Sequence, residues 1–240
     1  MKKIVSTLSL VSLVIITSAQ SLIPMKYGIK VGTNISNIIS IPNDGVKNIE
    51  SASVNGIAAG LFFEIAINDK WYINPELIYS QKGASFTYEY THTYDVNQID
   101  VHNTSHELKL PYLELNPTFS YKASDKIALN FGPSVSFILT PEYTIISDDG
   151  KNDNLNSHSE LPEGTYKEEN IDLGLNLGIS YYLSENFLID SRVNTSFLNA
   201  GTISKLTNTG ITNGVLTNIP EMNIYEIKNS VISFSIAYLF

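Results

Sequence analysis

The sequence contains no cysteine, which excludes disulfides, thiolate metal sites and an N-terminal lipid anchor on cysteine. Basic residues are also scarce. The sequence has 15 Lys and Arg and 24 Asp and Glu, which gives a net charge of −9. Nucleic acid recruits positive charge, so an acidic chain of this kind predicts no nucleic-acid partner. The chain also lacks a phosphate loop and a dinucleotide fingerprint, and we predict no cofactor.

Long apolar runs are confined to the first residues of the chain. Two lysines precede a stretch at 4–16 that is apolar apart from Ser and Thr, and the small residues Thr17 and Ala19 suit a signal-peptidase site. This stretch is shorter than the roughly 20 residues of a spanning helix. We predict a cleaved signal peptide over 1–19 and a single domain over 20–240, whose net charge falls from −9 to −11 with the loss of the two lysines.

Beyond the leader, the dominant pattern has a period of two. No further apolar run approaches a spanning helix in length, so a membrane-bound form of this chain would have to be a closed β-barrel, which satisfies every backbone polar group within hydrocarbon. In 171–183 the odd positions are all Ile, Leu or Tyr, and the even ones are mostly Asp, Gly, Asn and Ser. Pro111 predicts a bulge or a late start in one strand. Similar patterns predict eight strands, at about 26–36, 54–66, 71–82, 107–121, 127–139, 171–183, 187–198 and 226–240.

The connections between these segments alternate in length. Three are short polar turns, at 68–70, 122–126 and 184–186. Between them lie four long polar segments, at about 37–53, 83–107, 140–170 and 199–225. Short periplasmic turns and long outward loops are typical of outer-membrane barrels. We therefore predict an all-β fold, an eight-stranded antiparallel up-and-down transmembrane β-barrel with both termini on the periplasmic side.

The polar face of the strands distinguishes a membrane barrel from a soluble, lipocalin-like one, since both alternate. This face is rich in Gly, Asn and Ser, which suit the narrow interior of an eight-stranded barrel better than a solvated surface. Aromatic residues such as Trp71 and Phe187 gather near the short turns on the apolar face, with a second level at Tyr79 and Phe137. We predict an outer-membrane location, with lipid and lipopolysaccharide around the barrel. A soluble periplasmic barrel that holds a lipid is the alternative.

Local sequences along nearly the whole mature chain resemble the PorT-like outer-membrane β-barrel family, common in Bacteroidota. The segments that carry the resemblance are Gly28–Asn34, Pro75–Gly83, Tyr112–Glu114, Gly132–Pro133, Asp172–Gly174 and Arg192. The resemblance implies the fold and the location but no activity. The final strand also ends in alternating apolar residues and Phe240, which resembles the signal read by barrel-assembly machinery, an expected partner.

Charged residues on the polar face are expected to meet inside the barrel. Buried charges must be paired, so we expect Arg192 to face Glu76 or Glu114. We interpret the resulting network as a structural plug, with a proton or ion path or a gate as the alternative. Its predicted members are Lys30, Glu64, Glu76, Glu114, Asp190 and Arg192, with Lys82 and Asp172 on the same face.

Histidines offer one candidate metal site in the sequence, and the acidic loop over 140–170 offers a second, weaker one for Ca²⁺. His92, His102 and His106 all fall in the predicted loop over 83–107, and with Asp100 they would bind zinc only if that loop folded back. Without a helix to bring them onto one face, their spacing carries little information. We therefore predict solvated loop histidines and no metal-binding residues.

The third predicted loop holds the only candidate for catalysis. His158, Ser159 and Glu160 have the residue types of a hydrolase, but adjacent side chains do not form a triad without support. The same loop is strongly acidic, which is typical of a solvated surface. We predict no catalytic residues and a monomeric, non-enzymatic barrel whose acidic loops serve envelope integrity, adhesion or binding of a protein partner. A lipid hydrolase at the rim is the alternative function.

Overall fold

The computed structural model describes residues 25–41, 50–95, 98–148, 166–168, 170–198, 201–204, 209–212, 215–218 and 224–240. All the regular secondary structure assigned within these ranges is β-strand. In this part of the chain there is no helix with the length and apolarity needed to cross a membrane. The predicted signal peptide and the residues at 158–160 lie outside the described residues.

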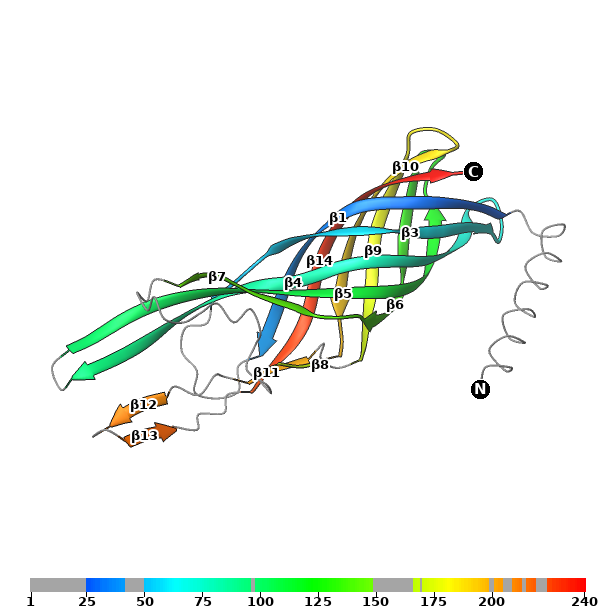
Figure 1. The fold of residues 1–240 in the computed structure, drawn as a ribbon. Helices are drawn as coiled ribbons and strands as arrows, with labels where there is room; N and C mark the ends of the chain where they lie inside the picture. Colours follow the sequence, from blue (N-terminus) through cyan, green and yellow to red (C-terminus); the bar gives the residue numbers. More distant parts are fainter. Residues whose placement is uncertain are drawn as a thin grey trace.

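Eight strands close into one antiparallel barrel (Figure 1). Strand β14 pairs with β1 from Leu239 opposite Gly28 to Glu226 opposite Ile41, and this pairing closes the sheet. The predicted fold class is therefore confirmed. In order around the barrel the strands are β1 (Met25–Ile41), β3 (Val54–Ala66), β4 (Trp71–Asp95), β5 (Gln98–Lys122), β6 (Ile127–Ile138), β9 (Ile171–Tyr182), β10 (Phe187–Ser196) and β14 (Ile224–Leu239).

One rim of the barrel carries the three short turns, as predicted. Each turn is closed by backbone hydrogen bonds, such as that from Ile67 N to Trp71 O at 2.8 Å. The start of β1 and the end of β14 meet at the same rim, where Phe240 N donates to Tyr27 O at 2.8 Å and the two rings stack with centroids 5.4 Å apart. The opposite rim receives the long connections.

Strands β4 and β5 continue far past that opposite rim, so the prediction of a loop over 83–107 is wrong. The two strands stay paired from Trp71 opposite Tyr121 to Asp95 opposite Gln98. Figure 1 shows this hairpin projecting away from the barrel body. The physical reason is that the run is rich in Tyr and Thr, which favour strands.

Short strands widen the projecting hairpin into a small sheet. Strand β2 (Glu50–Ala52) pairs with β4, and β7 (Glu142–Asp148) pairs with β5. The prediction for Pro111 is also wrong, because this residue pairs regularly with Gln81. On its other edge, β5 pairs with β6 from Tyr112 onward and with β7 up to Lys109. Pro111 lies between these two pairings, where its missing N–H costs no ladder hydrogen bond. The remaining short strands are β8 (Tyr166–Glu168), β11 (Gly201–Ser204), β12 (Thr209–Thr212) and β13 (Val215–Asn218).

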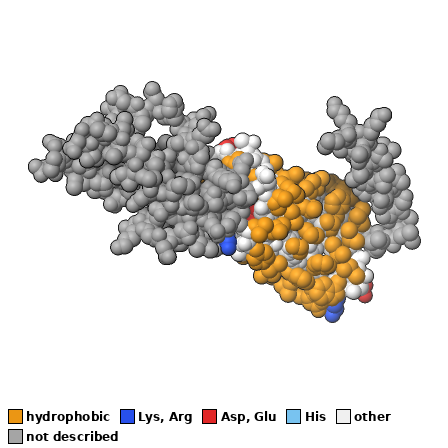
Figure 2. All heavy atoms as spheres, turned by 90° about the horizontal axis from the view of Figure 1, so that it is seen from below, with side chains coloured by type: hydrophobic (Ala, Val, Ile, Leu, Met, Phe, Trp, Pro, Cys, Tyr) orange, Lys and Arg blue, Asp and Glu red, His pale blue; other side chains and the backbone are white. Residues whose placement is uncertain are grey.

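Side chains alternate between the outer surface and the lumen. In β9, Leu175 and Leu177 are 38% and 56% exposed, whereas Asn176 between them is 2% exposed. Figure 2 shows the result as a broad apolar surface over the barrel. A soluble barrel would fill its centre with these leucines, so the alternative of a soluble lipid carrier is wrong.

Glycines on the inward face permit the lumen to be packed tightly. A Cβ atom at Gly60 would lie 2.8 Å from Cδ1 of Ile78, and one at Gly132 would lie 2.9 Å from Cα of Thr118. Both distances are shorter than real Cβ contacts. Gly83 is required for another reason, because its φ of 148° is one that other residues rarely adopt. The small residues on this face therefore follow from crowding, as the sequence suggested.

Candidate functional site

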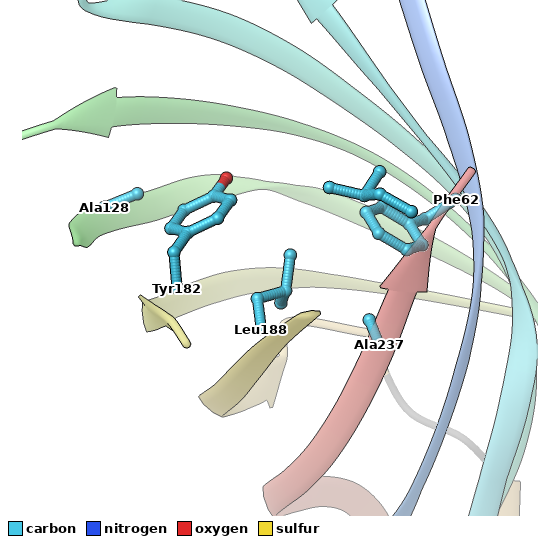
Figure 3. Packing of buried hydrophobic residues seen from close by; sticks show 6 residues of the cluster. Phe62, Ala128, Tyr182, Leu188 and Ala237 are labelled. Atoms are coloured by element: carbon cyan, nitrogen blue, oxygen red, sulfur yellow. The ribbon is translucent and has the colours of Figure 1, made fainter. Parts of the chain in front are cut away.

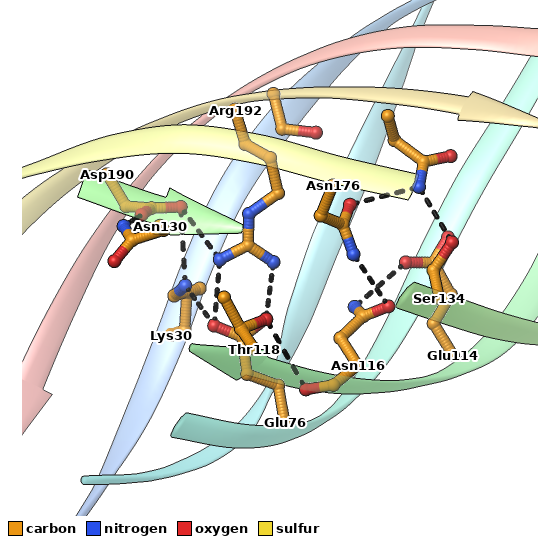
Figure 4. A network of polar contacts seen from close by, with 12 residues as sticks. Lys30, Glu76, Glu114, Asn116, Thr118, Asn130, Ser134, Asn176, Asp190 and Arg192 are labelled. Carbon is orange, nitrogen blue, oxygen red and sulfur yellow. Dashed lines mark hydrogen bonds and ion pairs between the residues drawn. The ribbon is translucent and has the colours of Figure 1, made fainter. Parts of the chain in front are cut away.

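Four charged side chains from three strands meet in the middle of the lumen (Figure 4). Arg192 on β10 donates to both carboxylate oxygens of Glu76 on β4, at 2.6 and 2.9 Å. Lys30 on β1 lies 2.7 Å from Glu76 Oε1 and 3.3 Å from Oδ1 of Asp190 on β10. All four side chains are more than nine-tenths buried. We call these residues the central ion network.

A second ion pair lies beside the central ion network. Lys82 Nζ is 2.8 Å from Glu114 Oε1 and 3.3 Å from Oδ1 of Asn194. Asn194 in turn donates to Ser134 Oγ at 2.8 Å and to Asn176 Oδ1 at 2.9 Å. Amide and hydroxyl groups thus carry the hydrogen bonds from one wall of the barrel to the other. This arrangement satisfies buried charges that would otherwise be costly.

The sixth predicted residue, Glu64, lies apart from the others, toward the short turns. It accepts a hydrogen bond from the Tyr182 hydroxyl at 2.5 Å, and Lys122 Nζ lies 3.4 Å away. Lys122 also sits 3.9 Å from the centroid of the Tyr72 ring. Sequence reasoning missed Lys122, which it placed in a turn. Tyr182 was visible in the sequence, since it continues the inward parity of β9.

Apolar side chains close the lumen on both sides of the polar residues. The group near the short turns, shown in Figure 3, consists of Phe62, Ala128, Tyr182, Leu188, Ala237 and Leu239. The group near the opposite rim is at most 1% exposed and consists of Ile38, Ala84, Leu108, Leu110, Tyr112 and Val231. Neither group is predicted by the alternation of the strands, which places apolar residues on the outer face.

Free space within the lumen is limited to small cavities. Two cavities beside Glu76 and Arg192 have volumes of about 10 and 40 Å³. One water molecule needs about 10–15 Å³ of such space, so these cavities hold a few waters at most. Across the described residues, the interior is tightly packed. All but one of its buried acids lie in ion pairs.

We expect the full chain to pass no steady current in a planar lipid bilayer. The reason is that both apolar groups and the central ion network obstruct the lumen. Single-channel recording of the purified protein checks this, with a bacterial porin in the same membrane as the positive control. Regular conductance steps that scale with the amount of inserted protein would instead favour the ion path or gate.

The structure does not test the candidate residues for zinc binding or for lipid hydrolysis. His92 lies in β4, and His102 and His106 lie in β5, so none of them is in a loop. The register sets His92 opposite Asp100. The side chains of Asp100 and of the three histidines lie outside those that the structure describes. His158, Ser159 and Glu160 lie outside the described residues altogether.

Comparison with known proteins identifies the family. The family model described as an outer membrane protein beta-barrel domain matches residues 18–200. This chain belongs to that family. The barrel is therefore an outer-membrane protein, and its exposed apolar surface faces lipid. No curated protein matches the chain significantly.

Several solved outer-membrane barrels are similar to this outer-membrane protein. Neisserial surface protein A is 12% identical, with 89% of this chain and 97% of that chain covered and a TM-score of 0.43. OprG from Pseudomonas aeruginosa is 13% identical over 90% and 95%, with a TM-score of 0.41. The outer membrane protease OmpT from Escherichia coli is 10% identical over 90% and 96%, with a TM-score of 0.38. At these values the likenesses assign no activity to this barrel.

Aromatic side chains of the barrel gather at the short-turn rim, the level of a membrane interface. The Trp71 ring contacts Tyr121 and Phe131, with centroids 5.0 and 6.3 Å away. On the other side of the barrel, Tyr238 lies 4.8 Å from Phe187 and 5.0 Å from Phe240. These contacts form the aromatic level predicted next to the short turns.

Proposed function

We propose that this barrel is a non-enzymatic anchor that displays the β4–β5 hairpin and the acidic connections outside the cell, for adhesion, partner binding or envelope integrity. The observation that carries the proposal is the length of β4 and β5, which have 25 residues each. A transmembrane strand needs only about 9–11 residues. More than half of each strand is therefore available beyond the bilayer.

The packed interior of the barrel supports the same proposal. The central ion network is paired within the wall, and the cavities beside it are too small for a substrate. An outer-membrane protein with such a lumen has its accessible chemistry at the outward rim. We propose that the barrel acts as a monomer, with outer-membrane lipid and lipopolysaccharide around it. During assembly, the machinery that reads the strand ending at Phe240 is a further partner.

Within its family, we propose that this chain belongs to the PorT-like branch. The residues that carry that resemblance are spread along the sequence, yet three of them meet in the lumen, since Arg192 contacts Glu76 directly and Glu76 contacts Lys30. Lys82, from the same segment as Glu76, forms the neighbouring ion pair with Glu114, from one further segment of the resemblance. Because the residues of the resemblance meet in one interior, they support kinship in fold, and they assign no activity.

The test is complementation of a strain that lacks the protein. In the trimmed variant, residues 86–106 are replaced by Asn-Gly, so that the paired residues Ser85 and Glu107 are joined by a two-residue hairpin turn. We expect this variant to insert normally but to behave like the empty strain in surface adhesion and in resistance to detergent. Insertion is measured by the change in electrophoretic mobility on heating.

A matched control changes the lumen and leaves the display intact. The double variant Glu76→Met with Arg192→Met removes one buried acid and one buried base and should complement as well as the wild type. Full complementation by the trimmed variant would refute the display role. Failure of the lumen variant, if it inserts normally, would shift the function into the barrel.

A further inference from the structure

Four polar side chains line one side of the lumen near the outward rim. They are Ser136 on β6, Asp172 on β9, Ser196 on β10 and Asn229 on β14, and each is at most 4% exposed. Ser136 and Asp172 are directly opposite one another in the β6–β9 register. Asp172 Oδ2 accepts hydrogen bonds from Ser196 Oγ at 2.7 Å and from Asn229 Nδ2 at 3.0 Å. We call these residues the outer polar cluster.

Three oxygen atoms of the outer polar cluster have no hydrogen-bond partner. They are Ser136 Oγ, Asp172 Oδ1 and Asn229 Oδ1. Among the described residues, six buried side-chain nitrogen and oxygen atoms lack a partner, and this cluster supplies half of them. Buried polar atoms in native proteins are almost always satisfied. Their concentration at one place therefore points to a ligand that accepts electron pairs from oxygen.

The charge of Asp172 points in the same direction. In the described part of the chain, it is the one buried acid for which no ion pair is found. A carboxylate buried without a partner is costly, so it calls for a counter-charge. The other buried acids each lie within 3.4 Å of a Lys or Arg nitrogen and are Glu64, Glu76, Glu114 and Asp190.

We propose that the outer polar cluster binds one small, oxygen-preferring cation of the Ca²⁺ or Na⁺ type. Asp172 supplies the charged ligand, and Asn229 and Ser136 supply neutral oxygens. Carboxylate and amide oxygens are the donors that hard cations take. No group of three or more Asp, Glu, His or Cys side chains is found among the residues searched. The cluster itself has one acid and no His or Cys, so it lacks the nitrogen and sulfur ligands typical of zinc.

At this position, the cation would cross-link the strands at the outward rim and stabilise that rim. Asp172 lies at the start of β9, directly after the third long connection, while Ser196 ends β10 and Asn229 lies in β14, on either side of the fourth. A cation held by these side chains would join the strands from which both connections leave. This inference does not depend on the display role, because it concerns the stability of the rim alone.

The test is thermal unfolding of the full chain in detergent, followed by circular dichroism. Protein stripped with a chelator and kept in choline chloride is titrated with CaCl₂ in one series and with NaCl in another, at constant ionic strength. At 100 times the dissociation constant, we expect the wild-type midpoint to rise by roughly 5–10 °C. The series that produces the rise identifies the cation.

The variant Asp172→Asn is expected to lose this rise. Glu114→Gln is the matched control, because it removes a buried acid that has its own lysine; it should lower the midpoint but retain the response to the cation. A wild-type midpoint that ignores both salts would overturn the proposal. A response that Asp172→Asn retains would also overturn it and would place the cation on the acidic outward segments. The same holds if lowering the pH raises the wild-type midpoint while neither salt does.

Discussion

Replacing Arg192 with Met is expected to lower the free energy of unfolding by about 3–5 kcal/mol, the usual cost of removing one partner from a buried ion pair. Arg192 is the bidentate partner of Glu76 and also lies 3.3 Å from Asp190. Without it, these two buried carboxylates share a single base, Lys30. Reversible unfolding in urea, from lipid vesicles, measures the loss.

A double variant separates the loss of charge balance from the loss of packing. Glu76→Met together with Arg192→Met removes an acid and a base at once and leaves Lys30 paired with Asp190. Because well-packed apolar pairs often replace buried ion pairs at little cost, we expect most of the stability to return. Costs that simply add in the double variant would contradict a coupled central ion network.

Replacing Leu177 with Arg is expected to destabilise the inserted barrel by about 2–4 kcal/mol, the cost of a basic side chain on the lipid face near the middle of the bilayer. Leu177 lies near the middle of β9 and is 56% exposed. Once the barrel is inserted, that exposed surface contacts acyl chains. The same unfolding measurement in lipid vesicles detects the change.

Leu183→Arg provides the matched control on the same face. Leu183 is equally exposed but lies just beyond β9, at the short turn, where the cost falls to about 0–1 kcal/mol. The difference between the two variants therefore measures depth in the bilayer. Equal costs at both positions would mean that no hydrocarbon surrounds the barrel.

The strands of the barrel wall could be predicted because the membrane imposes a strict pattern on them. Each residue in the bilayer must face either lipid or the packed lumen, so apolar and small polar residues alternate, as Leu175, Asn176 and Leu177 do. The three short turns then fixed the orientation of the chain. Both signals are local, so one sequence was enough to detect them.

The projecting hairpin was not predicted, although part of it shows a period of two. Beyond the bilayer both faces of a sheet meet water, so pairing requires no alternation of apolar and polar residues. The run from Ser85 to Asp95 nevertheless alternates Phe and Tyr with Thr and Glu over much of its length, but the frequent Asn, Asp, Ser and Glu of 83–107 led us to predict a loop. Its strand propensity was a better guide than its hydrophobicity.

The parity of the strands predicted which charges turn inward, and the need to pair them predicted the contact of Arg192 with Glu76, but not the contacts of Lys30. Lys30 and Asp190 lie on strands far apart in sequence, and their contact depends on the closure of the barrel. Leu108 and Leu110 were harder still, since a lumen closed to water accepts apolar side chains as readily as a soluble core does. Only the three-dimensional arrangement shows these inner contacts.

The seam between β1 and β14 constrains how the molecule is made. Its hydrogen bonds join segments from opposite ends of the barrel domain, so none of them forms until the whole domain has been delivered. Until then, a growing sheet keeps two open edges, which are templates for aggregation. Any truncation that removes β14 would leave both edges permanently unsatisfied in hydrocarbon, and such a chain should be cleared by proteolysis before it inserts.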